Sequence, residues 1–188
     1  MKKGLIALIV ILVVIGILVV SVFGSYNSLV ALDESVNSQW ANVESKLQRR
    51  FDLIPNLVES VKGAMAQEQE VFTAIADARA KMAGAQGTTE KVEASNELEG
   101  ALGRLLVVVE NYPELKSNEN VTALMDELAG TENRISTERD RYNEVVNSYN
   151  SAIRKFPKNI LAGMFGFEQR PYFEATDGAD VAPEVNFD

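Results

Sequence analysis

The sequence contains no histidine and no cysteine among its 188 residues. These absences exclude a Ser-His-Asp triad, a Cys-His pair, a disulfide framework and an ordinary zinc site. The formal net charge of −9 also argues against a nucleic-acid partner, because phosphates are bound chiefly by clustered lysine and arginine. No motif indicates a cofactor or a small-molecule substrate. We therefore expect no catalytic, cofactor-binding or metal site.

Charged residues are also absent from the twenty residues that run from Gly4 to Phe23. This length matches the ~20 residues that a helix needs to cross the apolar core of a bilayer. At about −0.3 to −0.6 kcal/mol for each leucine, isoleucine, valine or phenylalanine, insertion is favoured by roughly 5 to 10 kcal/mol. Gly16 has no glycine four positions away, so the signal for tight helix pairing is weak. Residues 1–24 are predicted to form an N-terminal transmembrane helix.

The distribution of charge predicts the orientation of this helix. Lys2 and Lys3 precede it, whereas 16 basic and 27 acidic residues follow it, a net charge of −11. Because positive residues remain in the cytoplasm, we expect a single-pass protein of the cytoplasmic membrane with its N-terminus in the cytoplasm and its C-terminal domain outside. The alternative is a cleaved signal peptide. Its apolar stretch is usually ~7 to 15 residues long and ends in small residues, where this chain has Phe23.

Beyond the span, apolar residues recur every three or four positions, which is typical of helices that bury one face. Turn residues divide this pattern at Pro55, at Gly84–Gly87 and at Tyr112–Pro113. The predicted helices are 26–51, 55–84, 89–111 and 118–156. We expect an all-α fold, in which the transmembrane helix is followed by an elongated up-and-down antiparallel four-helix bundle over residues 25–157. A single kinked helix from 26 to 84 is the alternative, and no strand is predicted.

In the four-helix arrangement, the loops at 52–56 and 112–117 share the membrane-distal end of the bundle. These loops are the predicted contact surface for a partner. The candidate contact residues are Arg49, Arg50, Asp52, Pro55, Asn56, Tyr112 and Pro113.

Several polar residues interrupt the apolar stripes. Thr131 and Glu138 fall at core-facing positions of the last helix, and Arg49, Arg50 and Arg139 lie close to the stripes of their own helices. A buried charge must be paired, because an unpaired one costs several kcal/mol. These residues are interpreted as a polar layer that fixes the register of the bundle. An acid-base site is the alternative, but no nucleophile or metal ligand accompanies them.

The predicted tail domain, residues 158–188, is rich in aromatic residues and poor in helical pattern. Its apolar stretch is too short to cross a membrane. The tail is expected to close the open end of the bundle, and the alternative is a segment that contacts a partner or the membrane. The candidate contact residues are Phe165, Phe167, Tyr172 and Phe173.

Several segments resemble the signature of the LemA family. The most specific is Gln48–Val58, with the sequence QRRFDLIPNLV; others are Tyr26–Glu34, Trp40–Glu44, Glu132–Ile135, the repeated Tyr-Asn pairs at 142 and 149, Phe156–Pro157 and Tyr172–Phe173. The resemblance covers essentially the whole chain. It implies a single-pass anchor that carries a helical bundle, with no catalytic residues. Members of the family are usually regarded as non-enzymatic envelope proteins, some linked to membrane remodelling and others found beside membrane peptidases.

Two functions are therefore expected from the sequence. The first is a scaffold that is held in the lipid bilayer by its N-terminal helix and forms a homo-oligomer. The second is an accessory or adaptor subunit of an envelope membrane protein, such as a membrane peptidase. The absence of catalytic motifs favours the first, and the predicted distal loops motivate the second.

Overall fold

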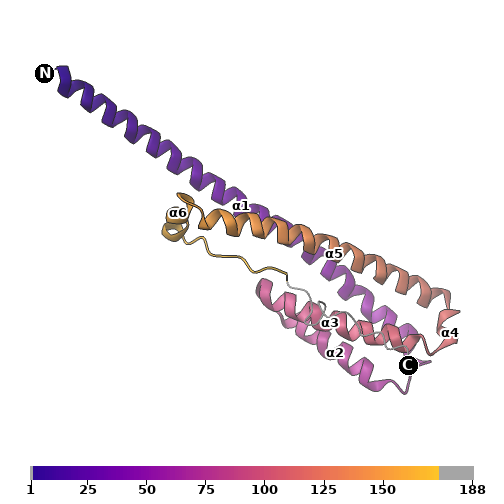
Figure 1. Cartoon of the computed structure of the whole chain (residues 1–188). Helices are drawn as coiled ribbons and strands as arrows, with labels where there is room; N and C mark the ends of the chain where they lie inside the picture. Colours follow the sequence, from indigo (N-terminus) through magenta and orange to yellow (C-terminus); the bar gives the residue numbers. More distant parts are fainter. Residues whose placement is uncertain (1, 174–188) are drawn as a thin grey trace, which may run out of the picture. The chain divides into compact units, whose positions relative to one another are not determined.

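The computed structural model describes residues 2–173, so Met1 and residues 174–188 of the predicted tail lie outside the described part. Within it, the chain forms helices and turns and contains no strand (Figure 1). The helices are α1 (Lys2–Lys62), α2 (Gln69–Gly84), α3 (Gly87–Val109), α4 (Pro113–Lys116), α5 (Glu119–Arg154) and α6 (Lys158–Phe165). The expected all-α fold with an N-terminal apolar helix is confirmed. The division into domains 1–24, 25–157 and 158–188 stays a prediction.

The first helix is longer than predicted. It runs without interruption from Lys2 to Lys62 and contains Pro55 in its interior. The predicted break at 52–56 is therefore wrong, and so is the alternative of one helix to residue 84, because a turn separates α1 from α2. Ile54, Leu57 and Val61 explain the continuity, since all three are buried on one stripe across the proline. Each contributes about 1.5–3 kcal/mol on burial, which together exceeds the ~3 kcal/mol that an interior proline costs.

The N-terminal part of α1 is apolar on every face. Its described side chains from Gly4 to Phe23 are all exposed. The mean hydropathy of its most apolar 18 residues is 3.5, and α1 is the one helix among residues 2–173 that is long and apolar enough to cross a membrane. A soluble surface helix would show a polar face.

The helix boundaries at the other turns were predicted closely. α2 ends at Gly84 and α3 begins at Gly87, which adopts a positive φ of 78°. α5 begins at Glu119, after Asn118 accepts hydrogen bonds on its side-chain oxygen from the backbone N–H groups of Asn120 and Val121. This side-chain cap satisfies donors that would otherwise be unpaired in the first turn.

The described chain divides into two compact units. One contains residues 2–41 and 141–170, and the other contains residues 42–140 and 171–173. In the first unit, Leu29, Val36, Val146 and Tyr149 are buried. The ring of Trp40 packs edge-on against Tyr142, with 5.4 Å between the ring centroids.

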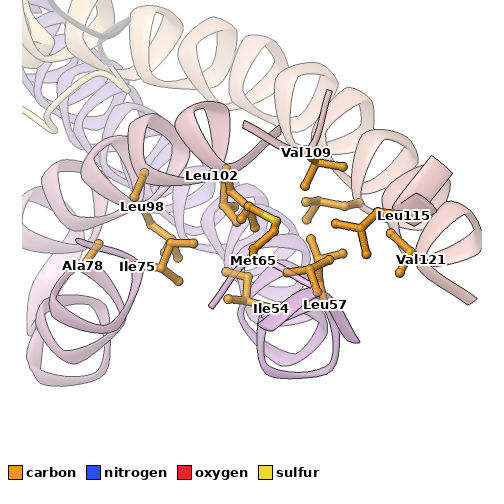
Figure 2. Close-up of a cluster of buried hydrophobic side chains, with 14 residues drawn as sticks. Ile54, Leu57, Met65, Ile75, Ala78, Leu98, Leu102, Val109, Leu115 and Val121 are labelled. Carbon is orange, nitrogen blue, oxygen red and sulfur yellow. The ribbon is translucent and has the colours of Figure 1, made fainter. Parts of the chain in front are cut away.

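The second unit holds a larger apolar core. Its buried side chains come from the end of α1, from the antiparallel pair α2 and α3, from the turn around α4 and from the N-terminal part of α5 (Figure 2). The two turns at 63–68 and 110–118 meet, because the Tyr112 hydroxyl donates a 2.9 Å hydrogen bond to Glu68. The prediction that a loop at 52–56 shares an end of the bundle with the loop at 112–117 is therefore wrong, and the turn at 63–68 takes the place of the first loop. The core residues are Ile54, Leu57, Val61, Met65, Ile75, Ala78, Leu98, Ala101, Leu102, Leu105, Val109, Leu115, Val121 and Leu128.

Candidate functional site

A completely buried arginine stands at the centre of the second unit. Arg50 of α1 is 0% exposed. Its Nη1 donates to Oε2 of Glu132 on α5 at 2.9 Å. Its Nη2 donates to both oxygens of Ser95 on α3, the hydroxyl at 2.6 Å and the carbonyl at 3.0 Å. One guanidinium group therefore joins three helices, because its planar fork presents several donors at fixed angles.

A second arginine completes this group. Arg139 of α5 donates to Oε2 of Glu99 at 2.8 Å, and Glu99 also lies 3.8 Å from Nη1 of Arg50. The guanidinium carbon of Arg139 lies 4.3 Å from the ring centre of Phe173, which is buried. We call Arg50, Ser95, Glu99, Glu132 and Arg139 the Arg50 cluster. Two cations and two carboxylates balance its formal charge, as a buried ionic group requires.

The electrostatics of the cluster favour pairing over proton transfer. Burial lowers the pKa of Arg50, while the charge and the hydrogen bond of Glu132 raise it again, and Arg139 contributes a further lowering. An arginine nevertheless stays protonated in proteins, so it cannot serve as a base near neutral pH. Both carboxylates are engaged with guanidinium groups. The cluster can hold three helices in register, and its geometry supplies no nucleophile beside a base.

The predicted polar layer thus exists around Arg50 and Arg139, but its other members differ from those expected. Thr131 is buried and donates to the Glu127 carbonyl of its own helix at 2.8 Å. Glu138 is half-buried. The carboxylates come instead from Glu99 and Glu132.

Sequence reasoning missed Ser95, Glu99 and Glu132 as members of the cluster. Ser95 lies three residues before Leu98, on the buried stripe of α3. A polar serine on an apolar stripe was the signal in the sequence that could have indicated a buried polar contact.

The predicted contact residues near Pro55 do not form a loop, since they lie on α1. Arg50 is inside the protein and cannot belong to a contact surface. Arg49 is exposed and pairs with Glu127 at 2.9 Å. Asp52 is exposed and accepts a hydrogen bond from Gln48 at 2.8 Å. Asn56 is exposed, and Pro55 is half-buried. Of the predicted loop residues, Tyr112 and Pro113 do lie in a turn.

The predicted tail residues separate into different environments. Phe165 and Phe167 pack against Tyr26 of α1, with ring centroids 4.8 Å and 6.0 Å from that of Tyr26. Tyr172 is partly exposed, whereas Phe173 is buried against Arg139. The first two residues belong to the first unit and the last two to the second.

In the first unit, polar contacts hold the chain after α5 in place. Arg170 pairs with Asp33 of α1 at 2.8 Å, and its backbone exchanges two hydrogen bonds with the side chain of Asn150. Lys158 donates to the Ser28 hydroxyl at 2.8 Å. The part of the tail up to Arg170 is thus fixed against its own helices.

A groove of about 840 Å³ lies along α2 and α3 in the second unit. Small residues line it, namely Ala74, Ala78, Gly100 and Ala101, with charged residues such as Glu93 among the rest of the lining. The side-chain oxygen of Asn96, which also lines the groove, is buried and has no hydrogen-bond partner within the described chain. Sequence reasoning did not find this groove, because small residues on a helix carry no apolar signal. No group of three potential metal ligands occurs among residues 2–173.

An exposed apolar span followed by a helical bundle defines a membrane-associated helical protein. The family model for the LemA family matches residues 39–187. The chain belongs to the LemA family.

Several characterised relatives resemble it over most of its length. Magnetosome proteins MamQ 1 and MamQ 2 of Paramagnetospirillum magneticum are each 31% identical, over 83% of this chain and 67% of theirs. Protein LemA of Metamycoplasma hominis is 24% identical over 87% of this chain and 75% of its own.

Proposed function

We propose that this protein is a non-enzymatic scaffold of the bacterial cell envelope. The N-terminal part of α1 anchors it in the cytoplasmic membrane, and the remaining helices self-associate or hold partners outside. The observation that carries the proposal is the apolar span of α1, none of whose most apolar 18 residues are buried within the chain. A helix that is apolar all round needs lipid or other apolar helices around it. The magnetosome relatives are named for a structure and not for a reaction, which supports a structural role.

The charge distribution supports an outward-facing bundle, because Lys2 and Lys3 precede the span and the excess of acidic residues follows it. The absence of native cysteine makes this orientation easy to test. Ser45 is exposed on α1, so Ser45→Cys offers a single labelling site. We expect a membrane-impermeant maleimide to label it in intact cells. Labelling only after the membrane has been permeabilised would reverse the proposed orientation.

The scaffold proposal is tested by particle size. The full-length protein in mild detergent is compared with a chain that begins at Gly24, with circular dichroism to confirm that both are helical. We expect a defined large assembly for the full-length protein and a monomer for the shorter chain. If the full-length protein were a monomer and formed no crosslinks in native membranes, the proposal would fail.

The groove along α2 and α3 favours a second candidate, an adaptor that binds a segment of an envelope membrane protein. Gly100 lines this groove and Gly103 does not, and a Cβ added at either position has no atom within 4 Å. We expect Gly100→Leu to abolish a photocrosslink formed from position 93 in native membranes. Gly103→Leu should retain that crosslink. Both variants should gain about 0.5–1 kcal/mol in stability, because glycine weakens a helix interior. Equal crosslinking in the two variants would exclude the groove as the contact site.

A further inference from the structure

The short helix α6 exposes an unusual number of large apolar side chains. Leu161 and Ala162 are buried, but Ile160, Met164 and Phe165 are exposed, Met164 at 72%. Phe156, two residues before α6, is 80% exposed. A cluster of this kind in water would favour aggregation, so it indicates a surface that is covered in the working protein.

The position of α6 along α1 shows what can cover it. α6 lies beside α1 in the first compact unit (Figure 1). Phe165 packs on Tyr26, and Lys158 donates to Ser28. At 1.5 Å per residue, Tyr26 and Ser28 stand roughly 4.5 and 7.5 Å beyond Phe23, the last residue of the apolar span. The headgroup layer on each side of a bilayer is about 5–8 Å thick. If the span fills the apolar core, α6 lies at the depth of the headgroups.

The charge around α6 also suits a membrane surface. Arg154, Lys155 and Lys158 occur within five residues, in a chain whose net charge is −9. Asp33, an acidic residue of α1 in the same unit, is paired with Arg170. Local basic residues beside exposed apolar ones are typical of segments that lie in the interface of an anionic bilayer.

We propose that α6 and Phe156 form a second membrane contact, in the outer interface of the same bilayer that holds the span. Phe156, Ile160, Met164 and Phe165 enter the boundary between headgroups and acyl chains, and the basic residues face the headgroups. The part of the first unit that follows the span is thereby held at the lipid surface by two contacts, the span and α6, which fixes the angle at which α1 leaves the membrane. A second copy of the chain is the competing occupant of this surface.

The experiment uses the full-length, cysteine-free chain with one nitroxide label in vesicles of phosphatidylethanolamine and phosphatidylglycerol. The label is attached at Met164→Cys, and Ile160→Cys provides a second site on the same surface. Both side chains are exposed, so their replacement leaves the packing intact. Val13→Cys marks the span and Val107→Cys, on α3, marks an equally exposed apolar position of the second unit. Oxygen, which concentrates in lipid, and a water-soluble nickel chelate are compared as relaxing agents.

We expect the ratio of oxygen to nickel accessibility at positions 160 and 164 to lie between the high ratio at Val13 and the low ratio at Val107. A ratio equal to that at Val107 would place α6 in water and overturn the proposal. Low accessibility to both agents would mean that protein covers the surface, which also overturns it. The inference rests on the proposed anchoring of α1, and the Val13 label separates the two. Lipid exposure at 13 with water exposure at 164 refutes the second contact alone, whereas water exposure at 13 refutes the anchor itself.

Discussion

The two parts of α1 use apolar residues in opposite ways. Between Gly4 and Phe23 the apolar side chains occupy every face and are exposed. Between Leu29 and Val61 the buried apolar side chains lie along one stripe and polar residues separate them, while Val30 is the exposed large apolar residue of this part. The distribution of apolar residues around the helix, rather than their number, thus determines which surroundings each part requires. Lipid suits the first part and protein suits the second.

The largest expected effect comes from the one charge that the buried stripe contains. Arg50→Ala removes the guanidinium and leaves Glu132 and Ser95 without their main donor. Removing one partner of a buried ion pair costs about 3–5 kcal/mol. We therefore expect the free energy of unfolding, measured by denaturant titration with circular dichroism in mild detergent, to fall by that amount.

The adjacent Arg49→Ala is the matched control for this experiment. Arg49 pairs with Glu127 at the surface, with its side chain 58% exposed. Such pairs contribute about 0–1 kcal/mol. A loss in Arg49→Ala equal to that in Arg50→Ala would contradict the structural distinction between these two neighbours.

The same substitution in the two parts of α1 tests the comparison directly. Leu47 is buried and Leu12 is exposed. Leu47→Ala should lower the free energy of unfolding by about 2–5 kcal/mol, since it leaves a cavity. Leu12→Ala should leave the unfolding of the bundle unchanged, because it alters only a side chain that is exposed on the apolar span. The same denaturant titration measures both, and a large loss from Leu12→Ala would show that the span is part of the folded core.

Pro55 provides the next test, because the sequence and the structure assign it different roles. Within α1 it lacks the N–H that would bond to residue 51, at a cost of about 3 kcal/mol. Its rigidity in the unfolded chain offsets about 0.4–1 kcal/mol. Pro55→Ala should therefore raise the free energy of unfolding by about 2 kcal/mol, seen as a higher midpoint in denaturant. If Pro55 instead began a helix, as the sequence suggested, its replacement would lower stability.

The misplaced break at Pro55 shows what sequence reasoning could and could not predict. Helix type, the turns at 84–87 and 111–118 and the apolar span follow from local patterns, and the structure confirms them. The end of α1 depends on whether buried contacts offset a proline, and this balance is set by partners distant in sequence. A Pro in the first turn of a helix and a Pro inside a helix look alike in a single sequence.

The Arg50 cluster shows the same limit in the candidate site. The sequence placed Arg50 and Arg139 near the core, since each lies beside an apolar stripe. The sequence could not identify their partners, because Glu99 and Glu132 are two of 27 acidic residues. Only the packing of three helices brings these two carboxylates to the arginines. The sequence also showed that the tail containing α6 is rich in aromatic residues. It could not show that Phe165 packs on Tyr26, because the two residues lie far apart in the chain.

The smallest expected effect is a loss of stability at alkaline pH. It arises from two tyrosines of α5 in the first unit, which also contains the first residues of the buried stripe of α1. Burial raises the pKa of both Tyr142 and Tyr149, and the charge of Asp33 adds to the rise at Tyr149. The folded protein thus keeps these hydroxyl protons at a pH where the unfolded chain, with a pKa near ~10, has lost them. Their contribution is fully present below about pH 10 and is lost as the pH rises through the folded-state pKa values, because the unfolded state then binds fewer protons.

Denaturant titrations from neutral to alkaline pH should show stability falling above about pH 10. Tyr149→Phe should flatten that fall, and an equally steep fall in the variant would assign the alkaline loss to other groups.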